Sequence, residues 1–231
     1  MLHYKHIFFD LDDTFWDVRA NQEAAQRELF ATFGMADRFP DFDAYYGTFR
    51  EINQRLWIEY RDGIVDRETL RNQRFVRLLA SAGIDDPRLA MEMSNEYLRI
   101  SPTFNTLMPH SIETLEYLHG KGYPMSLITN GFNEVQFRKV ECSGLGRFFQ
   151  RITTSEFAGI GKPNPGIFEY AMRKAEVGPG ECIMVGDDVY TDIYGSSTVG
   201  MPSVFVNPTG AEHDQRPLHE VRSLRELKEI F

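Results

Sequence analysis

Four short apolar runs punctuate the chain, and polar residues follow each of them at once. The first run is His6-Ile7-Phe8-Phe9, and the others span residues 123–128, 181–185 and 203–206. Apolar runs of this length, bounded by turn-forming residues, are typical of strands that are buried on both faces. The pattern therefore predicts four buried strands, each with a polar loop at its carboxyl end.

Helix-length segments separate these runs, at residues 111–119, 132–142, 165–175 and from Tyr190 towards Gly200. Strands that alternate with helices indicate βαβ units and a parallel sheet. We therefore predict an α/β fold with a Rossmann-like parallel-sheet core. In such open sheets, ligands bind beyond the carboxyl ends of the strands.

Residues 17–103 lack strand-like runs and show helical spacing, with breaks near Gly34, Gly63 and Gly83. These residues form either four more helices of a single domain or a separate helical cap. We favour a cap at 17–103 and a catalytic core at 1–16 and 104–231, because the insert interrupts the βαβ rhythm directly after an acidic loop.

Composition narrows the function classes. No apolar stretch approaches the ~20 residues that a membrane-spanning helix needs, and the first residues do not resemble a signal peptide. Two cysteines, Cys142 and Cys182, are too few for a disulfide framework, which favours a reducing cytoplasm. A net charge of −9 argues against binding of nucleic acid polymers, but a divalent cation would still allow a small anionic substrate.

Asp10 and Asp12 follow the first predicted strand. Period-two geometry places both side chains on the same side of the chain. Two carboxylates in one small site can take different protonation states, so that one acts as a nucleophile and the other as an acid or base. Acidic pairs are also common in turns and helix caps, so this pair alone is weak support for catalysis.

Thr129 and Asn130 follow the second predicted strand and precede a helix. A hydroxyl and free backbone N–H groups at a helix N-terminus bind phosphate oxygens, although an ordinary cap would have the same sequence. Lys162 stands between Gly161 and Pro163 in a stiff loop. A fixed ammonium there could neutralise an aspartate and a phosphoryl group, whereas an isolated lysine is usually solvated.

Asp187 and Asp188 follow the third predicted strand, and Asp192 comes five residues after Asp187. Carboxylates at adjacent strand ends supply the oxygen ligands that Mg²⁺ prefers, and acidic residues also favour helix N-termini for electrostatic reasons alone. Each motif has an ordinary explanation. Their occurrence together, in four polar segments associated with strand ends, favours a phosphate-handling site.

These motifs resemble the four signature motifs of the haloacid dehalogenase superfamily, namely residues 10–14, Thr129, Lys162, and residues 186–187 with Asp192. The helical insert lies where that superfamily has its type-1 cap. The resemblance implies a phosphatase in which Asp10 forms an aspartyl-phosphate, Asp12 is the acid/base, Thr129 and Lys162 bind phosphate, and Thr14 braces the loop. It also implies Mg²⁺ held by Asp10, the Asp12 carbonyl, Asp187 and Asp192, with a direct role for Asp188 left open.

A narrower resemblance, to pyrimidine nucleotidases, rests on Trp16, Asn53 and residues 56–64 and 128–132. It implies hydrolysis of 5′-phosphates of nucleoside monophosphates. Asn53, Trp57 and Tyr60 are then candidates for specificity in the cap, and Trp16 or Trp57 could stack on a nucleobase. Aromatic residues at helical spacing are, however, more often packing residues.

Other functions remain open at this stage. The same fold could host a sugar-phosphate phosphatase, a phosphomutase or a metal-independent haloacid dehalogenase. A non-catalytic phospho-receiver is a remote alternative. We expect a small phosphorylated metabolite as partner, no membrane, and a monomer or homodimer.

Overall fold

The computed structural model describes residues 4–231. The chain divides into two compact units. The core unit comprises the described residues up to Val18 together with Asn105–Phe231, and the cap unit comprises Arg19–Phe104. These divisions lie two residues after the first predicted boundary and one residue after the second.

The core unit contains a six-stranded sheet in the order β3-β2-β1-β4-β5-β6, and every neighbouring pair is parallel. The α/β prediction and its four strands are confirmed, whereas β3 and β6 escaped prediction. The strands are β1 (His6–Phe9), β2 (Met125–Thr129), β3 (Arg151–Thr154), β4 (Cys182–Gly186), β5 (Ser203–Val206) and β6 (His219–Val221).

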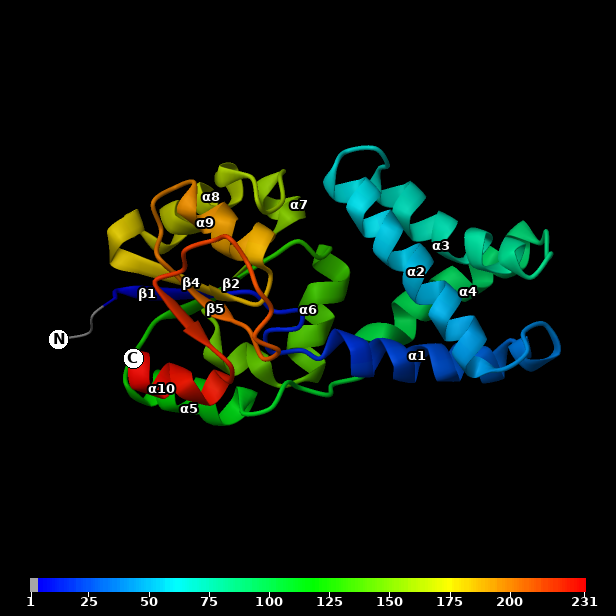
Figure 1. The fold of residues 1–231 in the computed structure, drawn as a ribbon, viewed down its shortest axis with the longest axis horizontal. Helices are drawn as coiled ribbons and strands as arrows, with labels where there is room; N and C mark the ends of the chain where they lie inside the picture. Colours follow the sequence, from blue (N-terminus) through cyan, green and yellow to red (C-terminus); the bar gives the residue numbers. More distant parts are fainter. Residues whose placement is uncertain (1–3) are drawn as a thin grey trace. The chain divides into compact units, whose positions relative to one another are not determined.

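Both faces of the sheet are covered by helices, which explains why its central strands are apolar throughout. Ile7 and Phe9 of β1 pack into one hydrophobic cluster with Leu115 of α5 (Ser111–Gly120). The intervening Phe8 points to the other face, where Phe168 of α8 (Pro165–Ala175) belongs to a second cluster. Figure 1 shows α8 and α9 (Gly195–Ser197) on one side of the sheet and α5 and α10 (Leu227–Ile230) on the other.

The remaining helical segments belong to both units. The predicted helix at 132–142 is α6 (Asn133–Cys142). The prediction of one helix from Tyr190 towards Gly200 was wrong. The chain instead forms a π-helix, η5 (Val189–Tyr194), followed by the short α9. The short segments are η1 (Met35–Asp37), η2 (Ser101–Thr103), η3 (Leu145–Phe148), α7 (Ser155–Ala158), η4 (Pro179–Glu181) and η6 (Leu224–Glu226).

The cap unit contains the four helices that the spacing predicts. They are α1, which begins at the unit boundary (Val18–Thr32), α2 (Phe42–Arg61), α3 (Arg67–Ser81) and α4 (Pro87–Ile100). Aspartates cap three of them, since Asp41, Asp66 and Asp86 each accept a backbone N–H three residues later. The predicted breaks at Gly34, Gly63 and Gly83 all have left-handed backbone conformations, which glycine adopts without strain.

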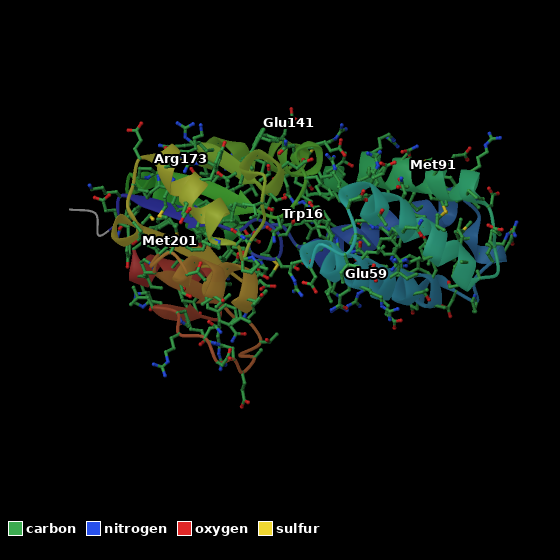
Figure 2. The ribbon with its side chains drawn as sticks, turned by 90° about the horizontal axis from the view of Figure 1, so that it is seen from above. Trp16, Glu59, Met91, Glu141, Arg173 and Met201 are labelled. Carbon is green, nitrogen blue, oxygen red and sulfur yellow. The ribbon has the colours of Figure 1, made fainter. Side chains whose placement is uncertain are left out.

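The cap unit has its own hydrophobic cluster, in which the rings of Phe49, Phe75 and Tyr97 contact one another. Figure 2 shows Glu59 and Met91 on the cap helices, and Arg173 and Met201 on the core unit. Among residues 4–231, no helix combines the length and apolarity needed to cross a bilayer.

Candidate active site

The aspartates meet because β1 and β4 are neighbours. Asp10 directly follows β1, Asp187 directly follows β4, and the two strands pair with Phe9 opposite Val185. From β1 the chain builds the sheet in one direction through β2 and β3, and from β4 in the other. Such a switch point leaves a crevice at the carboxyl ends of the strands, which is where ligands bind in sheets of this type.

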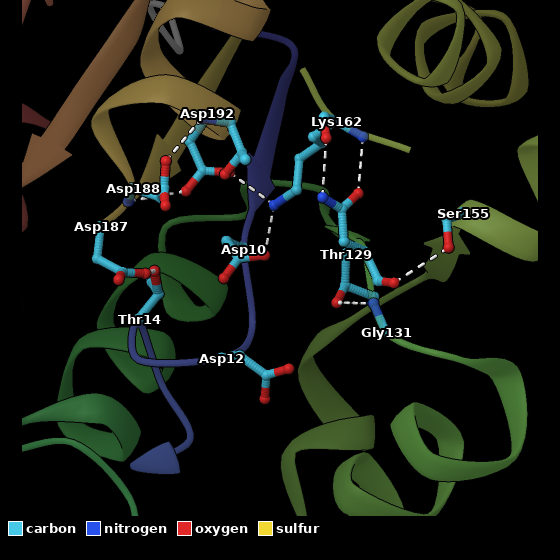
Figure 3. Close-up of polar contacts among 12 residues, drawn as sticks. Asp10, Asp12, Thr14, Thr129, Gly131, Ser155, Lys162, Asp187, Asp188 and Asp192 are labelled. Atoms are coloured by element: carbon cyan, nitrogen blue, oxygen red, sulfur yellow. Dashed lines mark hydrogen bonds and ion pairs between the residues drawn. The ribbon is translucent and has the colours of Figure 1, made fainter. Parts of the chain in front are cut away.

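Lys162 lies between two of these carboxylates (Figure 3). Its Nζ is 2.5 Å from Oδ1 of Asp10 and 2.6 Å from Oδ1 of Asp192, and the residue is 3% exposed. Burial alone would lower the pKa of Lys162, but the two carboxylates raise it above its ordinary value. Lys162 is therefore a fixed cation inside the site.

Three carboxylates form a cluster that fits a hard metal ion. One oxygen each of Asp10, Asp187 and Asp192 lies within 4.8 Å of the others. Burial, with the neighbouring carboxylates, raises the pKa of Asp10 to about 8 even beside Lys162, and it raises the pKa of Asp187 well above its ordinary value. The negative charge of the three carboxylates thus exceeds the positive charge of Lys162, so a bound cation would balance the cluster. Carboxylate oxygens are also the ligands that Mg²⁺ prefers.

Asp188 and Asp192 have different roles despite their proximity in sequence. Oδ1 of Asp188 accepts the backbone N–H groups of Tyr190 and Thr191 at 2.8 and 2.7 Å, so it caps η5. Asp192 is fully buried, joins the carboxylate cluster and accepts the Asp188 N–H through Oδ2 at 3.1 Å. Of the two, Asp192 is the residue placed to support a metal ion.

The Asp12 carboxylate is separate from this cluster. Its Oδ1 accepts Nζ of Lys139 at 2.5 Å, and its Oδ2 accepts Nε2 of Gln136 at 2.9 Å. Both donors come from α6, and sequence reasoning missed them. Their spacing of three residues on one helix face, directly after the Thr129 loop, was the available signal.

Asn130 joins the loop after β2 to the Lys162 loop. Its Oδ1 accepts the Lys162 N–H at 2.7 Å, and its Nδ2 donates to the Lys162 carbonyl at 2.9 Å. A Cβ at Gly161 would lie 2.8 Å from this Oδ1, which explains the glycine there. Oγ1 of Thr129 accepts the Gly131 N–H at 3.2 Å, so this hydroxyl lies at the start of the same loop.

Thr14 braces the loop that follows β1. Its Oγ1 donates to Oδ1 of Asp187 at 2.7 Å, which links the loop after β1 to the loop after β4. A threonine at this position therefore fixes one carboxylate of the cluster by a direct hydrogen bond.

The residues predicted to recognise a nucleobase are divided between the two units. Trp16 is 3% exposed within the core unit, and Nζ of Lys139 lies 3.8 Å from its ring centroid. This placement favours packing over base stacking. In the cap unit, Trp57 and Tyr60 make an edge contact on α2, and the buried Oδ1 of Asn53 has no hydrogen-bond partner among the described residues. Their role in specificity stays a prediction.

Comparisons with known proteins place this chain in a family. The family model for haloacid dehalogenase-like hydrolases matches residues 4–200. Pyrimidine 5′-nucleotidase YjjG of Escherichia coli strain K12 is 27% identical over 228 residues, which cover 97% of this chain and 96% of that protein. Glyceraldehyde 3-phosphate phosphatase of Pyrococcus furiosus is 32% identical over 206 residues, which cover 89% and 81%.

Solved structures give the same family. The magnesium-bound HAD-hydrolase YfnB of Bacillus subtilis has a TM-score of 0.88 at 27% identity and covers 99% of both chains. The 2-haloacid dehalogenase of Pseudomonas syringae pv. Tomato has a TM-score of 0.69 at 31% identity and covers 98% of this chain and 97% of its own. Because the family model matches residues 4–200, the chain belongs to the haloacid dehalogenase-like hydrolases.

Proposed function

We propose that this protein is a magnesium-dependent phosphate monoester hydrolase that works through an aspartyl-phosphate on Asp10. The observation that carries the proposal is the arrangement of Asp10, Asp187 and Asp192 around the buried Lys162. A carboxylate nucleophile and a phosphate group repel each other, so both need cationic partners in order to react.

In the first step, the Asp10 carboxylate attacks phosphorus and the bond to the leaving oxygen breaks. Asp12 donates its proton to that oxygen, which would otherwise leave as an alkoxide. Lys162, Thr129 and the backbone N–H groups of its loop bind the phosphoryl oxygens. Bound at Asp10, Asp187, Asp192 and the Asp12 carbonyl, Mg²⁺ would supply positive charge that offsets the repulsion between carboxylate and phosphate.

In the second step, water attacks the phosphorus of the aspartyl-phosphate. Asp12 accepts a proton from this water, the acyl-phosphate bond breaks, and Asp10 is regenerated with release of inorganic phosphate. Division of one slow hydrolysis into two displacements is the general advantage of covalent catalysis.

Nucleoside monophosphates, pyrimidine ones first, are the substrates that we propose. The nucleotidase-like residues of the sequence and the similarity to YjjG support this choice. A sugar-phosphate phosphatase is the second candidate, because the Pyrococcus furiosus enzyme is 32% identical. A reducing cytoplasm as the location is supported by Cys142 and Cys182, which are both free thiols.

A hydrolytic dehalogenase is less well supported, despite the structural similarity to such enzymes. That reaction releases halide from carbon and needs neither an acid for an alkoxide nor a metal ion. The Asp12 carboxylate and the third carboxylate of the cluster, Asp187, would then have no function.

A substrate panel tests the proposal. Phosphate release would be measured for UMP, dUMP, dTMP, purine nucleotides and sugar phosphates, with Mg²⁺, after chelation, and after Mg²⁺ is restored. We expect metal-dependent release with a preference for pyrimidine nucleotides. A preference for sugar phosphates would favour the second candidate, and full activity after chelation would overturn the mechanism.

Replacement of the nucleophile gives a second test. Asp10→Asn keeps the shape of the side chain but removes its nucleophilic charge, so turnover should fall by about 10⁴-fold or more. The wild-type protein should form an acid-stable, base-labile phosphoryl adduct on residue 10, detectable by mass spectrometry of quenched samples. Turnover by Asp10→Asn at the wild-type rate would contradict this mechanism.

A further inference from the structure

We infer that Lys139 and Gln136 are positioning residues that hold the Asp12 carboxylate for its proton transfers. This inference rests on the proposed function of Asp12. Each oxygen of Asp12 has its own donor, Nζ of Lys139 at 2.5 Å and Nε2 of Gln136 at 2.9 Å. Because the donors differ and stand on one rigid helix face, they fix the direction of the carboxylate as well as its location.

Asp12 needs such support because it lies at a partly exposed turn. It lies beyond the end of β1, and its side chain is 30% exposed. The next residue, Asp13, has a left-handed backbone with φ of 58°, so the chain turns immediately after Asp12. Misplacement of a catalytic group by about 1 Å can lower a rate by about 100-fold, so fixing this carboxylate matters for proton transfer.

Lys139 is itself held in place. The residue is 7% exposed, and its ammonium lies 3.8 Å from the centroid of the Trp16 ring, a cation–π contact. Trp16 is in turn fixed by backbone bridges to Asp12 and Leu107. Lys139, Trp16 and Asp12 thus each contact the other two. The Trp16 ring supports Lys139, and Lys139 holds the Asp12 carboxylate.

Gln136 connects this set to the phosphate-binding loop. A Cβ on Gly131 would lie 1.7 Å from Nε2 of Gln136, so the side chain passes directly against the glycine backbone. Any larger residue at 131 would push Gln136 away from Asp12. Steric contact with Gln136 therefore explains the glycine at position 131, independently of phosphate binding.

The leaving group distinguishes a positioning role from a structural one. An alkyl phosphate such as a nucleoside monophosphate needs a proton from Asp12 as its bond breaks, whereas p-nitrophenyl phosphate releases a stable phenolate without one. The first step can be measured alone, as release of the alcohol or of p-nitrophenol in a single turnover, because Asp12 also acts in the second step for both substrates. We expect Lys139→Met to slow this first step by about 10- to 100-fold for alkyl phosphates and by less than about threefold for p-nitrophenyl phosphate. Gln136→Met should show the same selectivity with a smaller loss.

Two control variants sharpen the comparison. Lys139→Arg keeps the charge and the donors, so it should recover part of the activity on alkyl phosphates. Arg138→Met removes one positive charge from the exposed adjacent position of α6 and should leave both substrates unaffected. Thermal unfolding of each variant would identify any general loss of folding, which would lower both activities equally.

Asp12→Asn separates failure of the inference from failure of the proposed function. If Asp12→Asn slows the first step selectively for alkyl phosphates but Lys139→Met and Gln136→Met do not, the positioning role is wrong and the proposed function stands. If Asp12→Asn slows this first step equally for both substrates, Asp12 is not the acid, and the proposed mechanism fails together with this inference. Faster turnover of alkyl phosphates by Lys139→Met would also overturn the inference.

Discussion

At the residue scale, the candidate site gathers more negative than positive charge in a buried space. Lys162 compensates two carboxylates, and Asp187 receives a hydroxyl from Thr14 and no ammonium contact among the described residues. Such a cluster opposes folding until a cation joins it, because buried like charges repel and have lost their hydration. Metal binding should therefore stabilise the folded protein as well as activate it.

Adding Mg²⁺ should raise the free energy of unfolding by about 3 kcal/mol at 100 times its dissociation constant. Asp187→Asn should abolish this increase, because it removes one carboxylate of the cluster. Asp188→Asn is the matched control and should keep the increase, since Asp188 caps η5 and lies outside the cluster. Calorimetry with and without Mg²⁺ would measure the difference, and an equal loss in both variants would contradict the assignment.

His6 gives a prediction about pH. It is 3% exposed and hydrogen-bonds to Ser126 at 2.9 Å, and burial, with the nearby Arg151, lowers its pKa to about 4. Below pH 6.5 the unfolded chain binds a proton that the folded chain does not accept until about pH 4. Stability is thus lost as pH falls, by about 2 kcal/mol between pH 7 and pH 5.

Urea denaturation at pH 7, 6 and 5 would measure this effect. His6→Gln keeps a hydrogen-bonding side chain but does not titrate in this range, so its stability should depend less steeply on pH than that of the wild-type protein. Parallel pH dependence in the two proteins would show that His6 is not responsible for the loss.

Much of the site could be predicted from the sequence at this scale. Asp10, Thr129 and Asp187 each follow or end an apolar run, so their convergence follows from the parallel sheet alone. Gln136 and Lys139 were missed, because their three-residue spacing shows only that they share a helix face, and Asp12 lies more than 120 residues away in the sequence. The motif pointed to Asp192 but left Asp188 open, and the backbone hydrogen bonds that make Asp188 a helix cap are seen only in the structure.

At the element scale, a glycine at the end of β4 allows a tight contact near the site. A Cβ on Gly186, the last residue of β4, would lie 2.2 Å from Oδ2 of Asp192. We expect Gly186→Ala to displace Asp192, to lower stability by about 1–3 kcal/mol and to weaken the response to Mg²⁺. Gly146→Ala is the control, because its nearest neighbour would be Val140 at an ordinary 3.5 Å. Equal effects of the two substitutions on the Mg²⁺ response would contradict this reasoning.

The elements that escaped prediction share a physical reason. β3 and β6 are the edge strands of the sheet, and both are short and partly exposed, so they lack the continuous apolar run of a central strand. The π-helix η5 depends on Asp188 and on the packing of Asp192 against Gly186, which are tertiary effects. The central strands and long helices, by contrast, follow from local patterns.

At the scale of the whole molecule, the two units have separate hydrophobic cores. The cap cluster includes Phe49, Phe75 and Tyr97, whereas the clusters of the core unit lie on the two faces of the sheet. Phe75→Ala should lower the stability of the cap unit by about 3–5 kcal/mol, because it leaves a cavity in a closely packed cluster. Hydrogen exchange measured by mass spectrometry should then show faster exchange in α2, α3 and α4, with β1 and β4 unchanged.

The protein has two tryptophans, Trp16 in the core unit and Trp57 in the cap unit. Trp57→Phe would leave intrinsic fluorescence that reports on the core unit, and Trp16→Phe would leave emission from the cap helices. The chain thus contains one natural optical probe for each unit, so a denaturation series followed by emission can show whether the two units lose their structure together or in sequence.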